Sequence, residues 1–340
     1  VAVNATGGPA EGGLSTTEAT AARAGADPGA ATAATGRKLK VVATFSVLGD
    51  LVRNVGGDLI ELSTLVPPGG DAHTFEPSPA DGVALAVADV VFENGLQFEA
   101  WLPDLFAASG SKARRVVLSE GIELLKAPEG EDDEHADETA TAGADRQAEG
   151  TATTGMDGHD EQGEWDPHVW HDVNNAVRMV EHIRDGLAAV DPANAATYRG
   201  NAASYLQQIK ALDAFVVAHA NTLPPERRKL VTTHDTFGYF ARRYSFEIVG
   251  TPLGVTTETA DPSAAEIVAL VNQIKATGVP AIFTENIENS RLMERIAREA
   301  GVELAPPLFS DALGEPGSDG DTYEKMIRYN VETIMKALGK

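Results

Sequence analysis

The chain has 340 residues, a formal net charge of −24 and no cysteine. The acidic balance argues against a nucleic-acid-binding protein, which needs a basic surface for phosphates. The lack of cysteine excludes disulfides, thiolate metal sites and cysteine nucleophiles.

Two stretches of low complexity interrupt otherwise patterned sequence. Residues 1–36 consist mainly of Ala, Gly and Thr, which cannot bury enough surface to offset the entropy of ordering, so we expect a flexible tether. Residues 129–164 contain 13 Asp or Glu and one Arg and are expected to form a mobile loop. This acidic loop is either plain solvated charge or a weak cation antenna.

From Leu39 onward, short apolar runs alternate with amphipathic helices, a pattern typical of a parallel sheet covered by helices. Residues 175–190 carry apolar side chains at steps of four and three and predict a helix between two such blocks. The expected strands are 39–45, 59–66, 89–93, 115–118, 229–233, 246–251, 281–284 and 303–305. Other expected helices include 79–87, 98–107 and 323–338.

We therefore expect an α/β fold of two lobes, each a mostly parallel four-stranded sheet flanked by helices, joined by one long rigid helix. The expected N-terminal lobe covers residues 37–173 and includes the acidic loop. The connecting helix covers 174–191, and the C-terminal lobe covers 192–340. With 43% hydrophobic residues, the chain is long enough for two packed cores.

Three histidines and one aspartate lie just beyond expected strands or where the two blocks meet. His73 lies in a Pro/Gly-rich loop, and His168 precedes the connecting helix. His234 follows the strand 229–233, and Asp311 lies in the last βα loop. Because ligands of open α/β sheets bind beyond the carboxyl ends of the strands, we expect these side chains to converge between the lobes.

Three imidazoles and a carboxylate suit Zn²⁺, whereas Ca²⁺ and Mg²⁺ call for more oxygen ligands. Mn²⁺ accepts the same donor atoms and is the alternative ion. Phe75, Trp170 and Phe237 adjoin the candidate ligands and are expected to form a dry shell around them, although ordinary core packing would look the same. Asp235, beside His234, is expected to be either a helix cap or a group that tunes the metal.

Several longer strings resemble the signatures of the metal-specific (cluster A-I) solute-binding proteins of ABC transporters. The resemblance spans about residues 38–338 and excludes the tether. The strings that carry it are 71–78 (DAHTFEPS), 166–170 (DPHVW), 233–240 (THDTFGYF), 309–313 (FSDAL) and 320–323 (GDTY).

This resemblance implies a monomeric protein outside the cytoplasmic membrane, either in the periplasm or anchored to the outer face of that membrane as a lipoprotein. It would capture a metal ion between two lobes and deliver it to the membrane permease of an ABC importer. The implied ligands are His73, His168, His234 and Asp311. Manganese-selective members usually have Glu at the third position, so His234 favours zinc. Zinc members often carry a His-rich loop before the second ligand, where this chain has only His135 and His159.

Two other classes of function are open to the same residues. A zinc hydrolase or hydratase would use the three histidines and leave one position for water. The chain lacks His-Glu-x-x-His, Gly-x-Ser-x-Gly and P-loop motifs, so we expect a binding protein without catalytic residues. A surface adhesin is the third class, because members of the family were often described as adhesins.

The remaining histidines of the patterned sequence have plainer interpretations. His171 lies three residues after His168, so it is either a bystander near the site or a further ligand. His219 falls on the apolar stripe of a long helix and is expected to be packed there. His182 lies off the stripe of the connecting helix and is expected to face solvent.

Overall fold

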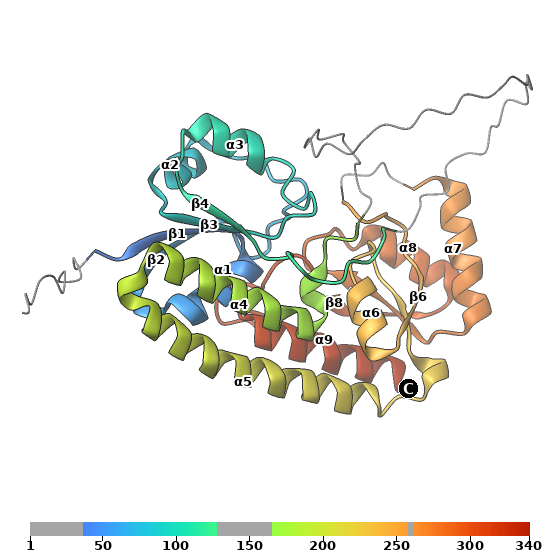
Figure 1. Ribbon diagram of the computed structural model, residues 1–340. Helices are drawn as coiled ribbons and strands as arrows, with labels where there is room; N and C mark the ends of the chain where they lie inside the picture. Colours follow the sequence, from blue (N-terminus) through green and yellow to red (C-terminus); the bar gives the residue numbers. More distant parts are fainter. Residues whose placement is uncertain (1–36, 128–164, 258–261) are drawn as a thin grey trace, which may run out of the picture. The chain divides into compact units, whose positions relative to one another are not determined.

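The computed structural model describes residues 37–127, 165–257 and 262–340, and the chain from Lys38 to Lys340 forms one compact unit (Figure 1). The expected tether 1–36 and acidic loop 129–164 lie outside the described residues. The strands are β1 (Leu39–Phe45), β2 (Ile60–Val66), β3 (Val90–Glu93), β4 (Arg114–Val117), β5 (Lys229–Val231), β6 (Glu247–Gly250), β7 (Ala281–Glu285) and β8 (Glu303–Leu308). The α-helices are α1 (Ser46–Gly56), α2 (Pro79–Val87), α3 (Leu102–Ser109), α4 (Val173–Val190), α5 (Ala195–Ala220), α6 (Gly238–Tyr244), α7 (Ala264–Thr277), α8 (Arg291–Ala300) and α9 (Tyr323–Leu338).

Residues 38–190, the N-terminal half, contain one four-stranded sheet in the order β2-β1-β3-β4, and every pair of neighbouring strands is parallel. The central strand β1 is apolar on both faces because both faces are covered by helices. Val41 and Phe45 pack with α1, α4 and α5, whereas Val42 packs with α2 and α3. The expected α/β class, with parallel strands flanked by helices, is confirmed.

Residues 191–340, the C-terminal half, differ from the expectation of a single four-stranded sheet. Their strands form two separate parallel pairs, β5-β6 and β7-β8. A register shift interrupts the first pair at Leu230/Val231 and the second pair between Phe283 and Glu285. In addition, β8 contains two prolines, which have no N–H to donate to a further strand. The predicted single sheet is therefore wrong for this half, and the division into two lobes stays a prediction.

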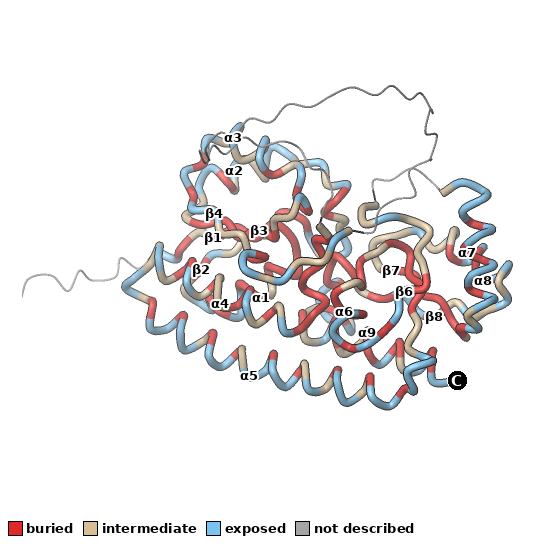
Figure 2. The backbone as a smooth tube through the Cα atoms, turned by 45° about the vertical axis from the view of Figure 1, so that its right-hand side comes forward, coloured by how far each residue is buried: buried red, intermediate tan, exposed pale blue. Residues whose placement is uncertain are grey.

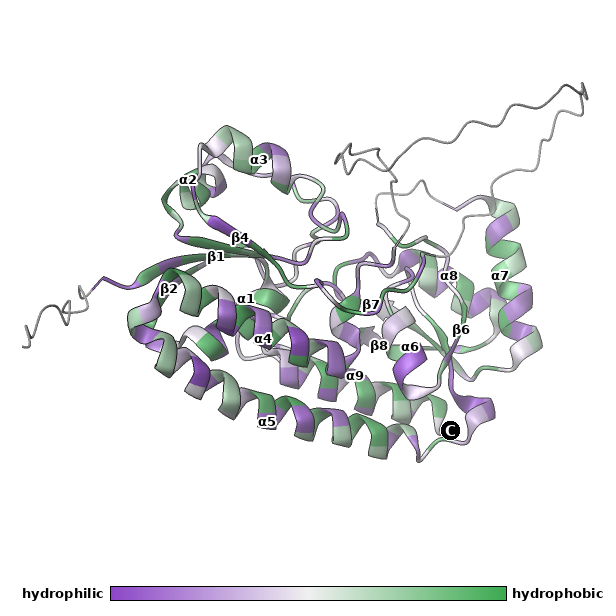
Figure 3. Cartoon of the chain, viewed as in Figure 1, coloured by the Kyte–Doolittle hydropathy of each residue, from purple (hydrophilic) through white to green (hydrophobic). Residues whose placement is uncertain are grey.

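Two long helices run beneath the strands. The predicted connecting helix is α4, which starts after Asp172, whose side chain accepts a hydrogen bond from the backbone N–H of Asn174. The 26-residue helix α5 follows and packs against α1, α4 and α9. Its buried side chains recur every three or four residues, so one side is buried and apolar while the other faces solvent (Figures 2 and 3).

Within the described ranges, no helix combines the length and hydrophobicity needed to cross a membrane. The loops that follow the carboxyl ends of the strands hold most of the buried polar side chains. These include His73, Glu99, His234 and Asp311, each at most 6% exposed.

Candidate metal centre

The first candidate ligand, His73, lies in the loop between β2 and α2. Asp71, two residues earlier, accepts a hydrogen bond from the backbone N–H of His73 through Oδ1 at 2.8 Å. The indole N–H of Trp101 donates to the carbonyl of Ala72 at 2.9 Å. A capping box between Ser78 and Asp81 starts α2 directly after the loop. The loop is thus held at both ends, with the imidazole buried.

The second candidate ligand, His168, repeats this arrangement just before a short 3₁₀ helix, Val169–His171. Asp166, again two residues earlier, accepts two hydrogen bonds through Oδ1. One comes from the backbone N–H of His168 at 2.9 Å and the other from its ring Nδ1 at 2.8 Å. Because Nδ1 then carries the proton, Nε2 is the nitrogen left to bind a metal ion.

The third candidate ligand, His234, follows β5 and depends on a carboxylate from another strand. Glu285, at the end of β7, accepts the backbone N–H groups of Thr233 and His234 through Oε1 at 2.8 and 3.0 Å. Its Oε2 lies 2.5 Å from Nδ1 of His234, although the pair lacks the alignment of a hydrogen bond. This contact again leaves Nε2 as the atom that faces the site.

Asp311 follows β8 and is fully buried. Its Oδ1 accepts a hydrogen bond from the hydroxyl of Thr236 at 3.1 Å, whereas Oδ2 has no hydrogen-bond partner among the described residues. The indole N–H of Trp170 donates to the carbonyl of the preceding residue, Ser310, at 3.1 Å. One carboxylate oxygen is therefore held by the protein and the other is available to a cation.

The structure brings all four predicted residues together. One ligand atom from each of His73, His168, His234 and Asp311 lies within 4.8 Å of the other three. Asp311 Oδ2 is 3.3 Å from Nε2 of His73 and 3.2 Å from Nε2 of His234, and Oδ1 is 3.6 Å from Nε2 of His168. Three nitrogens and one oxygen this close suit a single four-coordinate ion.

The electrostatics of the cluster also favour a cation. Burial opposes charge on His168, but the carboxylates of Asp311 and Asp166 outweigh it and raise the pKa of this imidazole to about 9. Burial likewise opposes charge on His234, yet Glu285 and Asp311 raise its pKa well above the ordinary value. Against the effect of burial, the histidines hold the pKa of Asp311 well below its usual range. The site is built for positive charge, and a metal ion would replace protons there.

Aromatic side chains pack against two of the imidazoles. The ring of Phe98 meets those of His73 and His168 edge-on, with centroids 4.7 and 5.9 Å away. The ring centroid of Trp170 lies 5.4 Å from that of His168, a contact that both a dry shell and ordinary core packing would give. Of the other two predicted aromatic neighbours, Phe237 stacks on His171 and Phe75 packs on Trp101.

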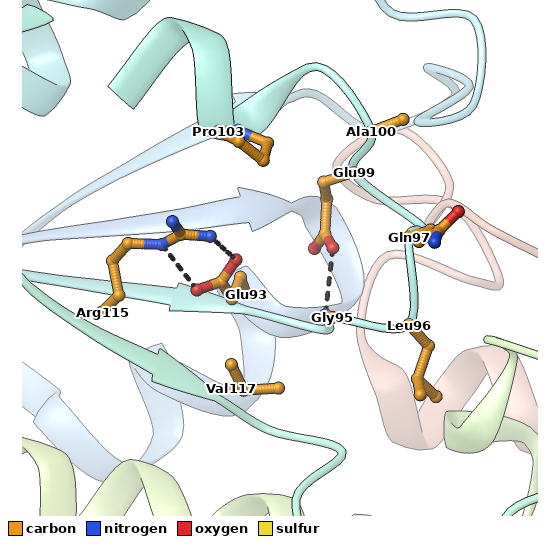
Figure 4. A pocket seen from close by; sticks show the side chains of 9 residues that line it. All are labelled: Glu93, Gly95, Leu96, Gln97, Glu99, Ala100, Pro103, Arg115 and Val117. Atoms are coloured by element: carbon orange, nitrogen blue, oxygen red, sulfur yellow. Dashed lines mark hydrogen bonds and ion pairs between the residues drawn. The ribbon is translucent and has the colours of Figure 1, made fainter. Parts of the chain in front are cut away.

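Phe98 is carried by the loop after β3, beside a cavity of about 510 Å³ (Figure 4). Gly95, Leu96 and Gln97 have positive φ angles of 84°, 56° and 61°. The backbone bonds that follow, from the N–H of Phe98 to Gly95 and from the N–H of Leu102 to Glu99, span three residues and form turns, so α3 starts at Leu102 and not at 98 as predicted. Glu99 stabilises this turn by accepting hydrogen bonds from the backbone N–H groups at positions 94 and 95 and from the hydroxyl at position 44.

The charged groups around this cavity are already engaged. Arg115 forms a two-pronged ion pair with Glu93 at 2.8 and 2.6 Å. Burial raises the pKa of Glu99 to about 7, against the opposing effect of its hydrogen-bond donors. These charged side chains therefore support the loop of Phe98 through their ion pair and hydrogen bonds.

His171 is fully buried beside Phe237, with ring centroids 4.5 Å apart, and in the part of the chain that the structure describes neither ring nitrogen has a hydrogen-bond partner. Burial, then the neighbouring His168, lowers its pKa to about 3. It does not belong to the four-residue cluster. His219 stacks on Phe215, whereas His182 lies near the surface with its ring beside the carbonyl of residue 120.

Three contributors to the site were not predicted from the sequence. Asp166 and Glu285 orient two imidazoles, and Phe98 covers two. In the sequence, Glu285 is a carboxylate at the end of an apolar strand. A buried carboxylate requires a partner, so this position was the one feature that could have indicated its role. Of the two alternatives for Asp235, the helix cap is wrong, because α6 begins at Gly238 with Phe237 at its N-cap position. The metal-tuning alternative stays a prediction.

Comparisons with known proteins agree with this geometry. The sequence model of the family "Zinc-uptake complex component A periplasmic" matches residues 41–337. The chain is 30% identical to the metal ABC transporter substrate-binding lipoprotein ScbA of Streptococcus cristatus, over 89% of this chain and 90% of that protein. It is 32% identical to the manganese-binding lipoprotein MntA of Halalkalibacterium halodurans, over 90% of each.

Among solved structures, the periplasmic zinc-binding protein TroA from Treponema pallidum superposes with a TM-score of 0.75 at 30% identity. The match covers 89% of this chain and 99% of TroA. The chain therefore belongs to the family of periplasmic zinc-uptake component A proteins: it is an extracytoplasmic substrate-binding protein of metal ABC transporters and not an enzyme.

Proposed function

We propose that this protein captures one Zn²⁺ ion with His73, His168, His234 and Asp311 and delivers it to the permease of its transporter. The observation that carries the proposal is the convergence of these four buried side chains, with ligand atoms within 4.8 Å of one another. Two come from each half of the chain, so the ion joins the halves. Binding should therefore stabilise the folded protein.

The donor set favours zinc over harder ions. Three imidazole nitrogens and one carboxylate oxygen fit a tetrahedral zinc shell, and TroA is named as a zinc-binding protein. Several relatives are named as manganese-binding, however, and Mn²⁺ accepts the same atoms. Mn²⁺ is therefore the second candidate cargo, and selectivity has to be measured directly.

The free oxygen of Asp311 distinguishes cargo binding from zinc catalysis. Oδ2 lies 3.3 Å or less from Nε2 of His73 and of His234 and has no hydrogen-bond donor of its own. If it binds the ion, the four-ligand shell is complete and no position is left for a reactive water. A closed shell suits a protein that holds an ion until a partner receives it.

Calorimetric titration of the metal-stripped full chain with Zn²⁺ and with Mn²⁺ tests the proposal. We expect one tight zinc equivalent, weaker manganese binding, and a loss of at least about 100-fold in zinc affinity for Asp311→Ala, more than an outer-shell change causes. The control is Asp104→Ala, which removes an exposed carboxylate of α3 and should bind as the wild type does. Zinc affinity unchanged in Asp311→Ala would indicate an open three-histidine site, and tighter binding of manganese would reassign the cargo.

The variant Asp311→Ala also distinguishes an adhesin from a metal-capturing protein. Adhesion by the surface of the protein should survive Asp311→Ala, whereas metal-dependent transport should not. Uptake of zinc by cells that carry the variant reports the second property.

A further inference from the structure

Asp71 lies beside the metal centre and contacts both halves of the chain. Its Oδ1 accepts the backbone N–H of His73 at 2.8 Å, which shapes the ligand loop. Its Oδ2 accepts the hydroxyl of Thr74 from the same loop at 2.9 Å. The same oxygen accepts the hydroxyl of Thr257, 186 residues further along the chain, at 2.6 Å. One carboxylate therefore connects the His73 loop to the C-terminal half.

The segment that carries Thr257 is fastened to the loop of His234. After β6, the backbone N–H of Leu253 donates to the carbonyl of Thr233 at 3.1 Å. The backbone N–H of Asp235 donates to the carbonyl of Gly254 at 3.0 Å. These two bonds lie on either side of His234 in the sequence. A displacement of the Thr257 segment is therefore coupled to the ligand on that side.

Other connections between the halves near the site are more deeply embedded. The backbone of Leu313 both accepts from the N–H of Gly69 and donates to the hydroxyl of Ser46, each at 2.9 Å. The indole of Trp170 is fully buried where it bonds Ser310. By contrast, Asp71 and Thr257 are only partly buried, and their bond joins two side chains. This bond can open without unfolding the core.

We propose that the hydroxyl of Thr257, acting through Asp71, is a positioning group that holds the His73 loop against the His234 loop and slows release of the bound ion. The Asp71–Thr257 bond and the bound ion both connect the His73 loop to the His234 loop. Each link therefore helps to keep the other in place. When the Asp71–Thr257 bond breaks, the His73 loop keeps its backbone bond from Gly69 to Leu313 but loses the tie next to His73, which can then leave the ion sooner. The inference rests on the proposed metal site and adds a role for residues that are not ligands.

The negative charges of Asp71 and Glu288 oppose contact between the two halves here, whereas the hydroxyl that Thr257 donates to Asp71 helps to hold them together. Glu288 lies in the loop after β7. Burial raises the pKa of Glu288, and the negative charge of nearby Asp71 raises it further. Two carboxylates from opposite halves repel each other across this contact. The hydroxyl of Thr257, which also belongs to the C-terminal half, offers Asp71 an attractive contact.

The test is the rate of zinc release from the zinc-loaded full chain, measured by stopped flow with excess chelator. Thr257→Val keeps the size of the side chain and removes the hydroxyl. Because a hydrogen bond to a charged group is lost at a partly exposed position, we expect release to become roughly five- to tenfold faster, with little change in the association rate. Thr257→Ser restores the hydroxyl and should return release to within about twofold of the wild type.

The matched control is Thr277→Val at the end of α7, because the hydroxyl of Thr277 bonds carbonyls of its own helix, those of Gln273 at 3.1 Å and Ile274 at 3.0 Å. It should release zinc as the wild type does. The inference is overturned if Thr257→Val releases zinc at the wild-type rate, or if Thr277→Val speeds release equally. A wild-type protein that binds neither Zn²⁺ nor Mn²⁺ would instead overturn the proposed function together with this inference.

Discussion

The two halves of the chain position their metal ligands in different ways. In the N-terminal half, His73 and His168 each follow an aspartate by two residues, and that aspartate accepts the backbone N–H of its histidine. In the C-terminal half, the corresponding contacts span the fold. His234 donates its backbone N–H to Glu285, 51 residues further along the sequence. Asp311 accepts the hydroxyl of Thr236, which is 75 residues away in the sequence.

This difference separates local from long-range preorganisation. A three-residue Asp-x-His motif forms its own turn, because an aspartate side chain readily accepts an N–H two residues onward. The C-terminal ligands instead need β5, β7 and β8 to be correctly placed before their partners meet. We therefore expect the C-terminal ligands to be more sensitive to substitutions of their partners.

Among residues that are not ligands, the largest effect is expected when the two orienting carboxylates are each replaced by an amide. Glu285 uses both oxygens, one for two backbone N–H groups and the other facing Nδ1 of His234. Glu285→Gln places an amide NH₂ against a donor, so zinc affinity should fall by about 10- to 100-fold. Asp166 makes both of its bonds to His168 through Oδ1 alone, so Asp166→Asn can keep them.

For Asp166→Asn we expect a loss of less than about tenfold, which reflects the missing charge. Calorimetric zinc titration of the two variants measures the contrast. Equal losses in both would show that the difference in hydrogen bonding between the halves has no consequence for the ion. Circular dichroism of each metal-free variant checks that both remain folded.

The same contrast explains what could be predicted from the sequence. The bounds of the strand 39–45 and of the helices 79–87 and 323–338 agree with the structure, because each depends on a local pattern. The four candidate ligands were selected from places just beyond expected strands or where the two blocks meet, and the structure brings them together. The division of β5, β6, β7 and β8 into two separate pairs was not predicted, because register shifts and the positions of distant strands decide it. Glu285 was missed for the same reason.

A smaller loss of zinc affinity is expected from a substitution at Gly238, which lies in the C-terminal half and contacts Asp166 in the N-terminal half. A Cβ on Gly238 of α6 would lie 2.7 Å from Oδ2 of Asp166, which is too close. Gly238→Ala should therefore push this carboxylate off its histidine and reduce zinc affinity by roughly three- to fivefold, below the range for losing an outer partner. The control is Gly200→Ala in α5, where an added Cβ meets nothing within 4 Å. A similar affinity in both variants would contradict this view of the contact.

The central claim is that one ion is bound by three imidazoles and one carboxylate drawn from both halves. X-ray absorption at the zinc edge of the loaded protein tests it most directly, because the spectrum reports the number and type of ligands. We predict three imidazole nitrogens and one oxygen at about 2.0–2.1 Å, with one imidazole fewer in both His73→Ala and His234→Ala. A shell with fewer than three imidazoles in the wild type, or one unchanged by either substitution, would contradict the account.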